Sequence, residues 1–361
     1  MDTTVGDILP GLKALAPLVS NQSTLPATLC VLVSGNTMTA TNLEAWATCT
    51  AEVETDKPFP LPGEDVIALL TDLPSTTPIS LTVQGRTLTV KTADREAVFD
   101  MPEPDGFPPA PSLDAAKTFE LPAAPVMEAL DQALPYAATE DSRPVLEGVC
   151  WDLAEGRMAA ADGYRLAVIP VPVVPAHDAK LLIPRDAARH MLRLWNESKG
   201  PLQVEYANFY ARFTCGSKNL TTSLTQGTFP KYKQLIPTQH TQSVVLGAEA
   251  LRKAVIALAP MTKKGSGIVR LQWQGKVLTV SARAEKVGRV ALNQMYLSVL
   301  LTRRTGPVTM HWGGGPANPV LCEFGDQGGA GAQFVFMPMF VQWNDKRRLP
   351  ESEDYHDHAH L

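Results

Sequence analysis

Three stretches of the chain carry apolar residues at the spacing that is typical of an amphipathic helix. They are residues 4–18 (TVGDILPGLKALAPL), 120–134 (ELPAAPVMEALDQAL) and 245–259 (VLGAEALRKAVIALA). In each stretch, apolar residues recur every three or four positions after a short start that resembles a strand. The pattern predicts three helices that each bury one face.

A second helix is predicted in each third of the 361-residue chain. The candidates are residues 60–73, 183–195 and 292–303, where apolar residues again follow a helical period. Because the two kinds of helix recur in the same order, at intervals close to one third of the chain, the sequence predicts an internal repeat.

Stretches between these helices alternate apolar and polar residues, as strands do. They are residues 79–92, 202–214 and 268–281, and each has a turn near its middle. Such alternation about a turn is typical of a half-buried antiparallel hairpin. The predicted fold class is therefore α+β, with three similar domains of two helices on antiparallel sheet. The predicted boundaries are 1–116, 117–241 and 242–344 for the three domains and 345–361 for a polar tail.

Composition narrows the class of protein. The hydrophobic fraction of 45% and the charged fraction of 19% fit a globular protein with sizeable cores. No apolar run of about 18 residues predicts a membrane span, and the N-terminus lacks the pattern of a secretory signal. We therefore expect a cytoplasmic protein. The formal net charge of −5 argues weakly against nucleic-acid binding, but it does not exclude a locally basic surface.

The sequence contains no motif of a known catalytic or metal site. It has no GxSxG, HExxH, P-loop or glycine-rich dinucleotide fingerprint, so we expect neither an enzyme nor a cofactor. The cysteines are far apart and form no CxxC pair, which predicts buried free thiols instead of a zinc site or disulfides. These cysteines are Cys30, Cys49, Cys150, Cys215 and Cys322.

Two neighbouring passages in the middle third are similar to one protein family. Residues 139–153 (TEDSRPVLEGVCWDL) are followed closely by residues 158–168 (MAAADGYRLAV). Together they resemble the middle domain of the bacterial sliding clamps, the β subunit of DNA polymerase III. In that family a strand ending in Leu-x-Gly leads to a hairpin with Asp-Gly-His-Arg-Leu-Ala, which here reads DGYRLA over residues 162–167.

Three further passages resemble the same family and follow its order. Residues 229–237 (FPKYKQLIP) are similar to its Phe-Pro-x-Tyr loop, and residues 335–339 (VFMPM) to its closing Met-Pro-Met. In the first third, residues 24–26 (TLP) and 41–44 (TNLE) are similar to its Thr-Leu-Pro and Thr-Asp-Leu-Glu. The resemblance extends over about residues 1–341.

The resemblance implies a non-catalytic processivity factor of a DNA polymerase. Two three-domain chains would meet head to tail through sheet edges and form a closed ring around double-stranded DNA, without reading its sequence. The implied partners are a second copy of the chain, the replicative polymerase, a clamp loader, and repair proteins that carry short clamp-binding peptides. No cofactor and no metal are implied.

The resemblance also implies an apolar cleft into which partner proteins insert a short peptide. In it, Leu166, Leu235 and Met337 would form apolar walls, and Arg165 would hold a carbonyl or carboxylate of the peptide. Without the resemblance, these residues could equally be plain core and a plain strand end. The implied cleft residues are Leu146, Ala161, Gly163, Tyr164, Arg165, Leu166, Pro230, Gln234, Leu235, Val335, Phe336, Met337, Pro338 and Met339.

Basic residues on the predicted second helix of the middle domain and in the third domain are candidates for contacts with DNA phosphates. The alternative is an ordinary solvated helix face. The candidates are Arg143, Arg185, Arg189, Arg193, Lys199, Arg252, Lys253, Lys263, Lys264, Arg303 and Arg304.

The chain departs from the family pattern in several places. Residues 21–23 (NQS) are neutral where the family often has a basic residue, and Pro144-Val145 stand where paired aromatic residues are expected. Tyr164 replaces the usual His, which puts the choice of peptides in question. A divergent clamp paralogue and a repeat-built protein-binding scaffold with altered partners therefore remain alternatives.

Residues 340–361 extend beyond the point where family chains stop. We expect residues 340–343 (FVQW) to pack beside the cleft and the remainder to be a mobile polar tail. The His and Asp residues near the end, at 354–360, could hold a metal or serve an enzyme, but a solvated tail is favoured.

Overall fold

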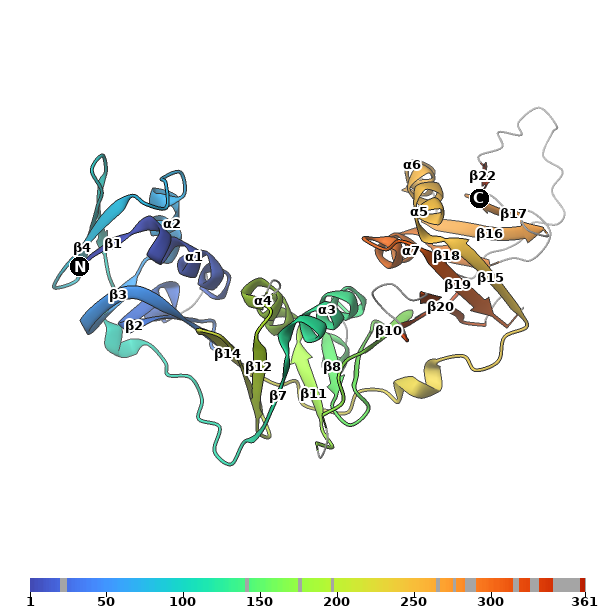
Figure 1. The fold of residues 1–361 in the computed structure, drawn as a ribbon, viewed down its shortest axis with the longest axis horizontal. Coiled ribbons are helices and arrows are strands. Elements are labelled where there is room, and N and C mark those ends of the chain that lie inside the picture. The colour runs from blue at the N-terminus through green and yellow to red at the C-terminus, as the bar shows by residue number, and fades with distance from the viewer. Residues whose placement is uncertain are drawn as a thin grey trace. The chain divides into compact units, whose positions relative to one another are not determined.

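The structure is a computed structural model of the full chain (Figure 1). By its internal contacts the chain forms two compact units, which we describe separately. Unit 1 comprises Met1–Leu130 and Leu182–Gln226, and unit 2 comprises Asp131–Leu181 and Gly227–Leu361. The structure describes residues 1–19, 25–139, 143–174, 177–195, 198–263, 267–274, 277–282, 290–313, 318–324, 331–339 and 358–360.

Unit 1 contains two antiparallel sheets. One has four strands in the order β1-β4-β5-β6, and the other has six in the order β2-β3-β14-β13-β12-β7. The strands are β1 (Asp2–Thr4), β2 (Val31–Thr41), β3 (Ala45–Leu61), β4 (Pro78–Gln84), β5 (Thr87–Lys91), β6 (Glu96–Asp100), β7 (Lys117–Pro122), β12 (Pro201–Tyr206), β13 (Tyr210–Cys215) and β14 (Lys218–Ser223).

The α-helices of unit 1 each follow a strand, directly or after one residue. At the start of α1, the Asp7 carboxylate accepts hydrogen bonds from the backbone N–H of Thr4 at 2.9 Å and from its hydroxyl at 2.6 Å. The apolar face of α1 is buried, with Leu12 and Leu15 fully covered. The helices are α1 (Val5–Leu15), α2 (Gly63–Leu70), α4 (Arg185–Trp195) and the larger part of α3 (Ala123–Ala133), with the short 3-10 helices η1 (Ala16–Leu18), η2 (Pro26–Leu29) and η3 (Pro104–Gly106).

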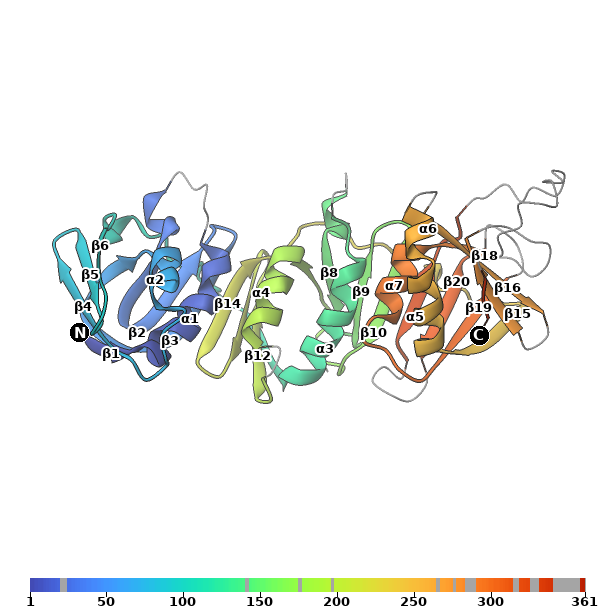
Figure 2. The same cartoon turned by 90° about the horizontal axis from the view of Figure 1, so that it is seen from above.

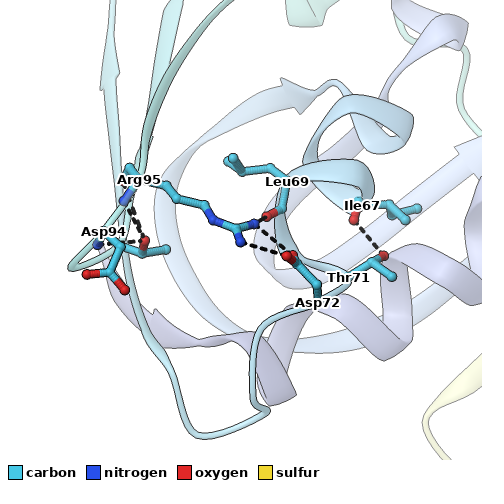
Figure 3. A network of polar contacts seen from close by, with 7 residues as sticks. Ile67, Leu69, Thr71, Asp72, Asp94 and Arg95 are labelled. Atoms are coloured by element: carbon cyan, nitrogen blue, oxygen red, sulfur yellow. Dashed lines mark hydrogen bonds and ion pairs between the residues drawn. The ribbon is translucent and has the colours of Figure 1, made fainter.

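Arg95 fixes the turn between β5 and β6 to the end of α2 (Figure 3). Its Nη1 donates to the Leu69 carbonyl at 2.8 Å and to Asp72 Oδ1 at 2.7 Å, and its Nη2 donates to Asp72 Oδ2 at 2.6 Å. The hydrogen bonds from Arg95 lower the pKa of Asp72 to about 2. A two-pronged ion pair fixes orientation as well as distance, so β6 is held in a defined position against α2.

Unit 2 also contains two antiparallel sheets. One has eight strands in the order β11-β8-β9-β10-β21-β20-β19-β15, and the other has four in the order β18-β16-β17-β22. The strands are β8 (Gly148–Asp152), β9 (Arg157–Ala161), β10 (Arg165–Pro170), β11 (Lys180–Pro184), β15 (Gln242–Gly247), β16 (Ile268–Gln274), β17 (Val277–Ser281), β18 (Val290–Asn293), β19 (Pro307–Trp312), β20 (Val320–Phe324), β21 (Gln333–Phe336) and β22 (His358–His360).

The helices of unit 2 pack together beside the strands. In Figure 2, α5 and α7 lie side by side, in agreement with the contacts between them. The Asn293 side chain caps the N-terminus of α7. It accepts hydrogen bonds from the backbone N–H groups of Met295, at 2.9 Å, and Tyr296, at 3.4 Å. The helices are α5 (Ala248–Ala257), α6 (Ala259–Lys263) and α7 (Gln294–Leu301), with the 3-10 helices η4 (Leu134–Tyr136), η5 (Pro144–Leu146) and η6 (Tyr232–Leu235).

The predicted helices and hairpins are confirmed. The first helix of each third is α1, α3 or α5, and the second is α2, α4 or α7. The three predicted hairpins are β4–β5, β12–β13 and β16–β17. The strand that precedes each first helix begins at Asp2, Lys117 or Gln242, close to the predicted domain starts.

The two compact units do not coincide with three domains, because two sheets continue from one repeat into the next. Within unit 1, β3 of the first repeat pairs antiparallel with β14 of the second. Within unit 2, β10 of the second repeat pairs antiparallel with β21 of the third. Contacts across a shared sheet are as close as those within a repeat, so the three-domain division stays a prediction.

The expectation of a mobile tail is wrong for three of its residues. His358–His360 form β22, which pairs antiparallel with the edge of β17. An edge strand offers unpaired N–H and C=O groups, which a tail segment can satisfy. Residues 340–357, which include the stretch expected beside the cleft, lie outside the described residues.

Two predictions from composition can be compared with the structure. All five cysteines are free and buried, as predicted, and burial raises the pKa of the Cys150 thiol to about 12. Among the described residues, no helix is both long enough and apolar enough to cross a membrane.

Candidate functional site

The turn between β9 and β10 presents Tyr164 to solvent. The Asp162 carboxylate accepts hydrogen bonds from the backbone N–H groups of Tyr164 and Arg165, both at 3.0 Å. Gly163 adopts a φ of 90°, in the left-handed region that glycine enters without strain. Because the turn is fixed by its own hydrogen bonds, the Tyr164 side chain is held outward and is 63% exposed.

Four predicted or neighbouring apolar residues form one row across adjacent strands. Ala161 of β9 lies opposite Leu166 of β10, which lies opposite Val335 of β21, which lies opposite Leu321 of β20. Residues opposite one another in a sheet place their side chains on the same face. All four are buried, so this part of the predicted cleft is a covered apolar floor.

Arg165 is held by contacts within unit 2. Its Nε donates to Asp162 Oδ2 at 2.8 Å, and its Nη2 donates to the Pro135 carbonyl at 2.8 Å. The guanidinium lies over the rings of Tyr136, at 5.0 Å, and Tyr296, at 4.3 Å. The side chain is only 12% exposed, and Nη1 is buried without a hydrogen-bond partner among the described residues. The geometry therefore favours a supporting role over the predicted contact with a peptide.

The loop that resembles Phe-Pro-x-Tyr is anchored to the β8–β9 hairpin. Tyr232 is buried, and its hydroxyl donates to Asp152 Oδ2 at 3.2 Å. Burial, reinforced by Asp152, raises the pKa of Tyr232. Lys180 pairs with the same carboxylate oxygen at 3.1 Å, and Lys233 pairs with Glu155 at 2.5 Å. These contacts fix η6.

With η6 fixed in this way, two predicted cleft residues are left at the surface. Leu235 is 50% exposed and Gln234 is exposed, while Pro230 is half-buried. Leu235 and Gln234 are therefore accessible to a partner.

The other end of this loop is held on β19. The rings of His240 and His311 stack with centroids 4.5 Å apart. His311 Nδ1 shares a hydrogen bond with the Ser243 hydroxyl at 2.6 Å, and its Nε2 lies 3.3 Å from Glu323 Oε2. Because His311 lies opposite Leu321, it belongs to the face that carries the apolar row. The loop is thus attached at both ends to one sheet.

The segment after β21 passes the β9–β10 turn. The Met337 N–H donates to the Tyr164 carbonyl at 2.8 Å, and the Met339 N–H donates to the Ala291 carbonyl at 2.8 Å. Met337 is 43% exposed, and Pro338 and Met339 are half-buried. Tyr164 and Met337 are therefore exposed residues of two segments that a backbone hydrogen bond holds together. The remaining predicted residues, Leu146 and Phe336, are buried.

Residues 120–231, which cover much of this site, match the family model of the DNA polymerase III beta subunit, central domain. The beta sliding clamp of Pseudomonas aeruginosa is 24% identical over 287 residues, which is 76% of this chain and 78% of that protein. The beta sliding clamp of Escherichia coli K12 is 24% identical over 288 residues, with the same coverage. This chain is a relative of the bacterial sliding clamps.

The sliding-clamp fold extends over nearly the whole chain. The crystal structure of the DNA polymerase III beta subunit from Pseudomonas aeruginosa has a TM-score of 0.82 at 22% identity, covering 94% of this chain and 99% of that one. The corresponding subunit from Thermotoga maritima has a TM-score of 0.84 at 20% identity, with the same coverage. The fold predicted from the resemblance is therefore confirmed.

In this clamp fold, α4 carries the clearest basic stripe. Arg185, Arg189 and Arg193 recur every four residues and so share one side of the helix. The opposite side is buried, including Met191 and Trp195. Arg189 and Arg193 are exposed, and Arg185 is half-buried. Asp186 neutralises part of the stripe through an ion pair with Arg189 at 2.8 Å.

Two other residues predicted to contact DNA are engaged within unit 2. The Arg304 guanidinium lies over the rings of Phe324, at 4.5 Å, and Phe334, at 4.4 Å, which commits it to packing. Arg303 is exposed and lies 3.7 Å from the Asp131 carboxylate.

The remaining basic candidates are dispersed. Arg143 lies against the β9–β10 turn, since a Cβ added to Gly163 would be 3.1 Å from its Nη2. Lys199 and Lys253 are exposed, and Arg252 is half-buried. The side chain of Lys263 and the whole of Lys264 lie outside the described residues.

Sequence reasoning missed three residues that shape the candidate site: Tyr136, Asp162 and Tyr296. Asp162 stood in the quoted motif and could have been found, because an Asp before Gly is a common turn former. Tyr136 and Tyr296 contact Arg165 from distant parts of the chain. A local sequence pattern does not predict such contacts.

Proposed function

We propose that this protein is a sliding clamp, a DNA polymerase processivity factor that forms a ring around duplex DNA and moves along it. The observation that carries the proposal is the threefold recurrence of one strand-to-helix unit, joined by sheets that continue between repeats. Such a unit extends in one direction, and two chains joined head to tail would close it. The protein itself catalyses no reaction.

The proposed hold on DNA is topological, supported by contacts to phosphate. A ring needs no sequence readout, and weak phosphate contacts leave it free to slide. The exposed arginines of α4, Arg189 and Arg193, are the side chains best placed to supply such contacts. The acidic net charge of −5 does not oppose this, because it is a sum over the whole surface.

The proposed partner site is the exposed apolar surface of Tyr164 and Met337 together with Leu235. An aromatic ring, a flexible thioether and an aliphatic side chain suit short apolar peptides of several sequences. The replicative polymerase, the clamp loader and repair proteins with clamp-binding peptides are the proposed ligands, in the cytoplasm. Tyr164 also favours a second candidate, a clamp paralogue with altered partners, because its exposed ring stands where the family usually has His.

Retention on DNA of different topology tests the ring. The full chain is loaded onto nicked circular duplex and measured by gel filtration before and after the circle is cut with a restriction enzyme. A ring stays on the circle and leaves the cut molecule. Equal retention on circular and cut DNA contradicts the proposal. So does a failure to be retained on either DNA when a matching clamp loader is supplied.

The partner site is tested separately with a short apolar peptide and Met337→Asp. The variant should weaken peptide binding without affecting retention on circular DNA. Val173→Asp serves as a control, because Val173 is another exposed apolar residue of unit 2, outside the predicted cleft. Equal weakening by both variants argues against a specific cleft.

A further inference from the structure

One strand order recurs in three places. The orders β1-β4-β5-β6, β7-β12-β13-β14 and β15-β19-β20-β21 each begin with the strand before a first helix and end with the third of three consecutive strands. We call β6, β14 and β21 the outer strands. Each stands at the same position within its repeat.

Two of the three outer strands pair with a strand of the preceding repeat. Outer strand β14 pairs antiparallel with β3, and outer strand β21 pairs antiparallel with β10. We call β3 and β10 the receiving strands. Each such pairing turns the sheets of two repeats into one continuous sheet.

The third outer strand, β6, ends its sheet. Among the described residues, its strand partner is β5 alone, so its other edge exposes backbone N–H and C=O groups. Val98 at its centre is 62% exposed, which is high for an aliphatic residue. The Arg95–Asp72 ion pair holds this strand against α2 (Figure 3). The edge of β6 is therefore apolar at its centre and has no strand partner among the described residues.

In the third repeat, β22 lies at the position in the strand order that a receiving strand has in the second repeat. The order β11-β8-β9-β10 ends in receiving strand β10, and the order β18-β16-β17-β22 has the same construction. In both, the strand before a second helix comes first and a hairpin follows. The fourth position is occupied by β22, which comes from the C-terminal segment and pairs with β17 over His358–His360.

We propose that β22 is the receiving strand of the third repeat, and that the outer strand β6 of a second copy of this chain pairs with it. The resulting order β18-β16-β17-β22-β6-β5-β4-β1 repeats the eight-stranded pattern of unit 2. The inference rests on the proposed ring and assigns to the C-terminal extension a place in its closure. Because β3–β14 and β10–β21 are antiparallel, the new pairing is antiparallel as well.

The position of β22 determines whether the β6 strand of a second copy can form backbone hydrogen bonds with the third repeat. Neighbouring strands are about 4.8 Å apart, so without β22 the outer strand of the partner would have to move inward by that distance to reach β17.

Deletion of residues 358–361 tests the proposal, with the dimer dissociation constant measured by analytical ultracentrifugation. Loss of β22 should raise the constant at least about tenfold. The control is His358→Thr with His360→Thr, which changes side chains and leaves the backbone able to pair; it should leave the constant unchanged. An unchanged constant after deletion overturns the proposal. A lower one also overturns it, by showing that β22 blocks the edge.

A substitution on the other side of the pairing gives an independent measurement. Val98→Lys places a charge on the edge of β6, a common means of preventing edge-to-edge pairing. It should weaken the dimer, whereas Val98→Thr should not. The deletion variant is used only if circular dichroism shows that it folds. Otherwise Ala359→Pro, which removes one backbone hydrogen-bond donor from β22, takes its place in the measurement.

The same variants separate this inference from the proposed function. If the full chain stays on circular DNA and the deletion variant dimerises as tightly, only the role of β22 is wrong. If the full chain leaves circular and cut DNA alike, the ring itself is wrong.

Discussion

Arg165 is enclosed by two tyrosine rings, and this determines what it can offer a partner. Its guanidinium is bonded to Asp162 and to the Pro135 carbonyl, so few donors remain for a ligand. By holding the turn that precedes β10, it supports the position of Tyr164 instead. Its planar guanidinium suits stacking as well as paired hydrogen bonds, which a lysine would not reproduce.

Tyr296 provides a test of this support. Tyr296→Leu removes the ring that lies 4.3 Å from the guanidinium and should lower the free energy of unfolding of unit 2 by about 0.5–2 kcal/mol. Tyr296→Phe keeps the ring and should lose much less. Urea denaturation measures both. Equal losses would show that the hydroxyl, not the ring, carries the contact.

The site was predictable at the residue scale only in part. Tyr164, Leu235 and Met337 lie at the surface, as a binding site requires, and all three come from recognisable motifs. Leu166, Val335 and Phe336 were predicted with them but are buried. A motif indicates which residues occur near a site, whereas burial depends on which distant segment covers them.

Among the elements, α4 joins a basic surface to a buried histidine. His190 lies on the covered side of the helix, and its Nδ1 has no hydrogen-bond partner among the described residues. Burial, together with nearby Arg193, lowers its pKa from 6.5 to about 4. The folded protein therefore holds this ring neutral where the unfolded chain would protonate it.

The stability of unit 1 should depend on pH through His190. Well above pH 6.5 the ring is neutral in both states and contributes no pH dependence. As the pH falls from 6.5 towards 4, the unfolded state gains a proton first, so stability should decrease by about 2 kcal/mol between pH 7 and pH 5. Urea denaturation of the full chain and of His190→Leu at both pH values measures this. An identical decrease in the variant would contradict it.

Elements with a strong period were predictable, and elements made by distant pairing were not. The period in residues 4–18 indicates α1 because one helix face is buried whatever covers it. The strand β22 has no such signal. It is three residues long, and its strand pairing is with the edge of β17. For the same reason, the sequence did not show that β3 and β14, or β10 and β21, share sheets.

For the whole molecule, the position of charge matters more than its sum. Although the net charge of the chain is −5, α4 has a basic side. Arg189 and Arg193 on that side are exposed, and the apolar side of the helix is buried. In a ring, only the surface that faces DNA affects sliding, and an acidic exterior limits non-specific association elsewhere.

The salt dependence of DNA binding should report the α4 stripe. Arg189→Gln with Arg193→Gln removes two cations, and the slope of log affinity against log salt for a short duplex should decrease in magnitude by about 1–2. Fluorescence anisotropy over a range of salt concentrations measures the slope. Arg86→Gln is a control on an exposed turn of unit 1. A slope that is the same in the double variant as in the full chain would exclude α4 from the DNA surface.

The junctions between repeats differ in how readily they re-form after separation. When β3 separates from β14, or β10 from β21, the two strands stay tethered by the same polypeptide and meet again at a high local concentration. A junction between β22 and the β6 of another copy has no tether, and its re-formation depends on how much protein is present. In a ring closed as proposed, dilution therefore separates the two chains while the junctions inside each chain stay intact.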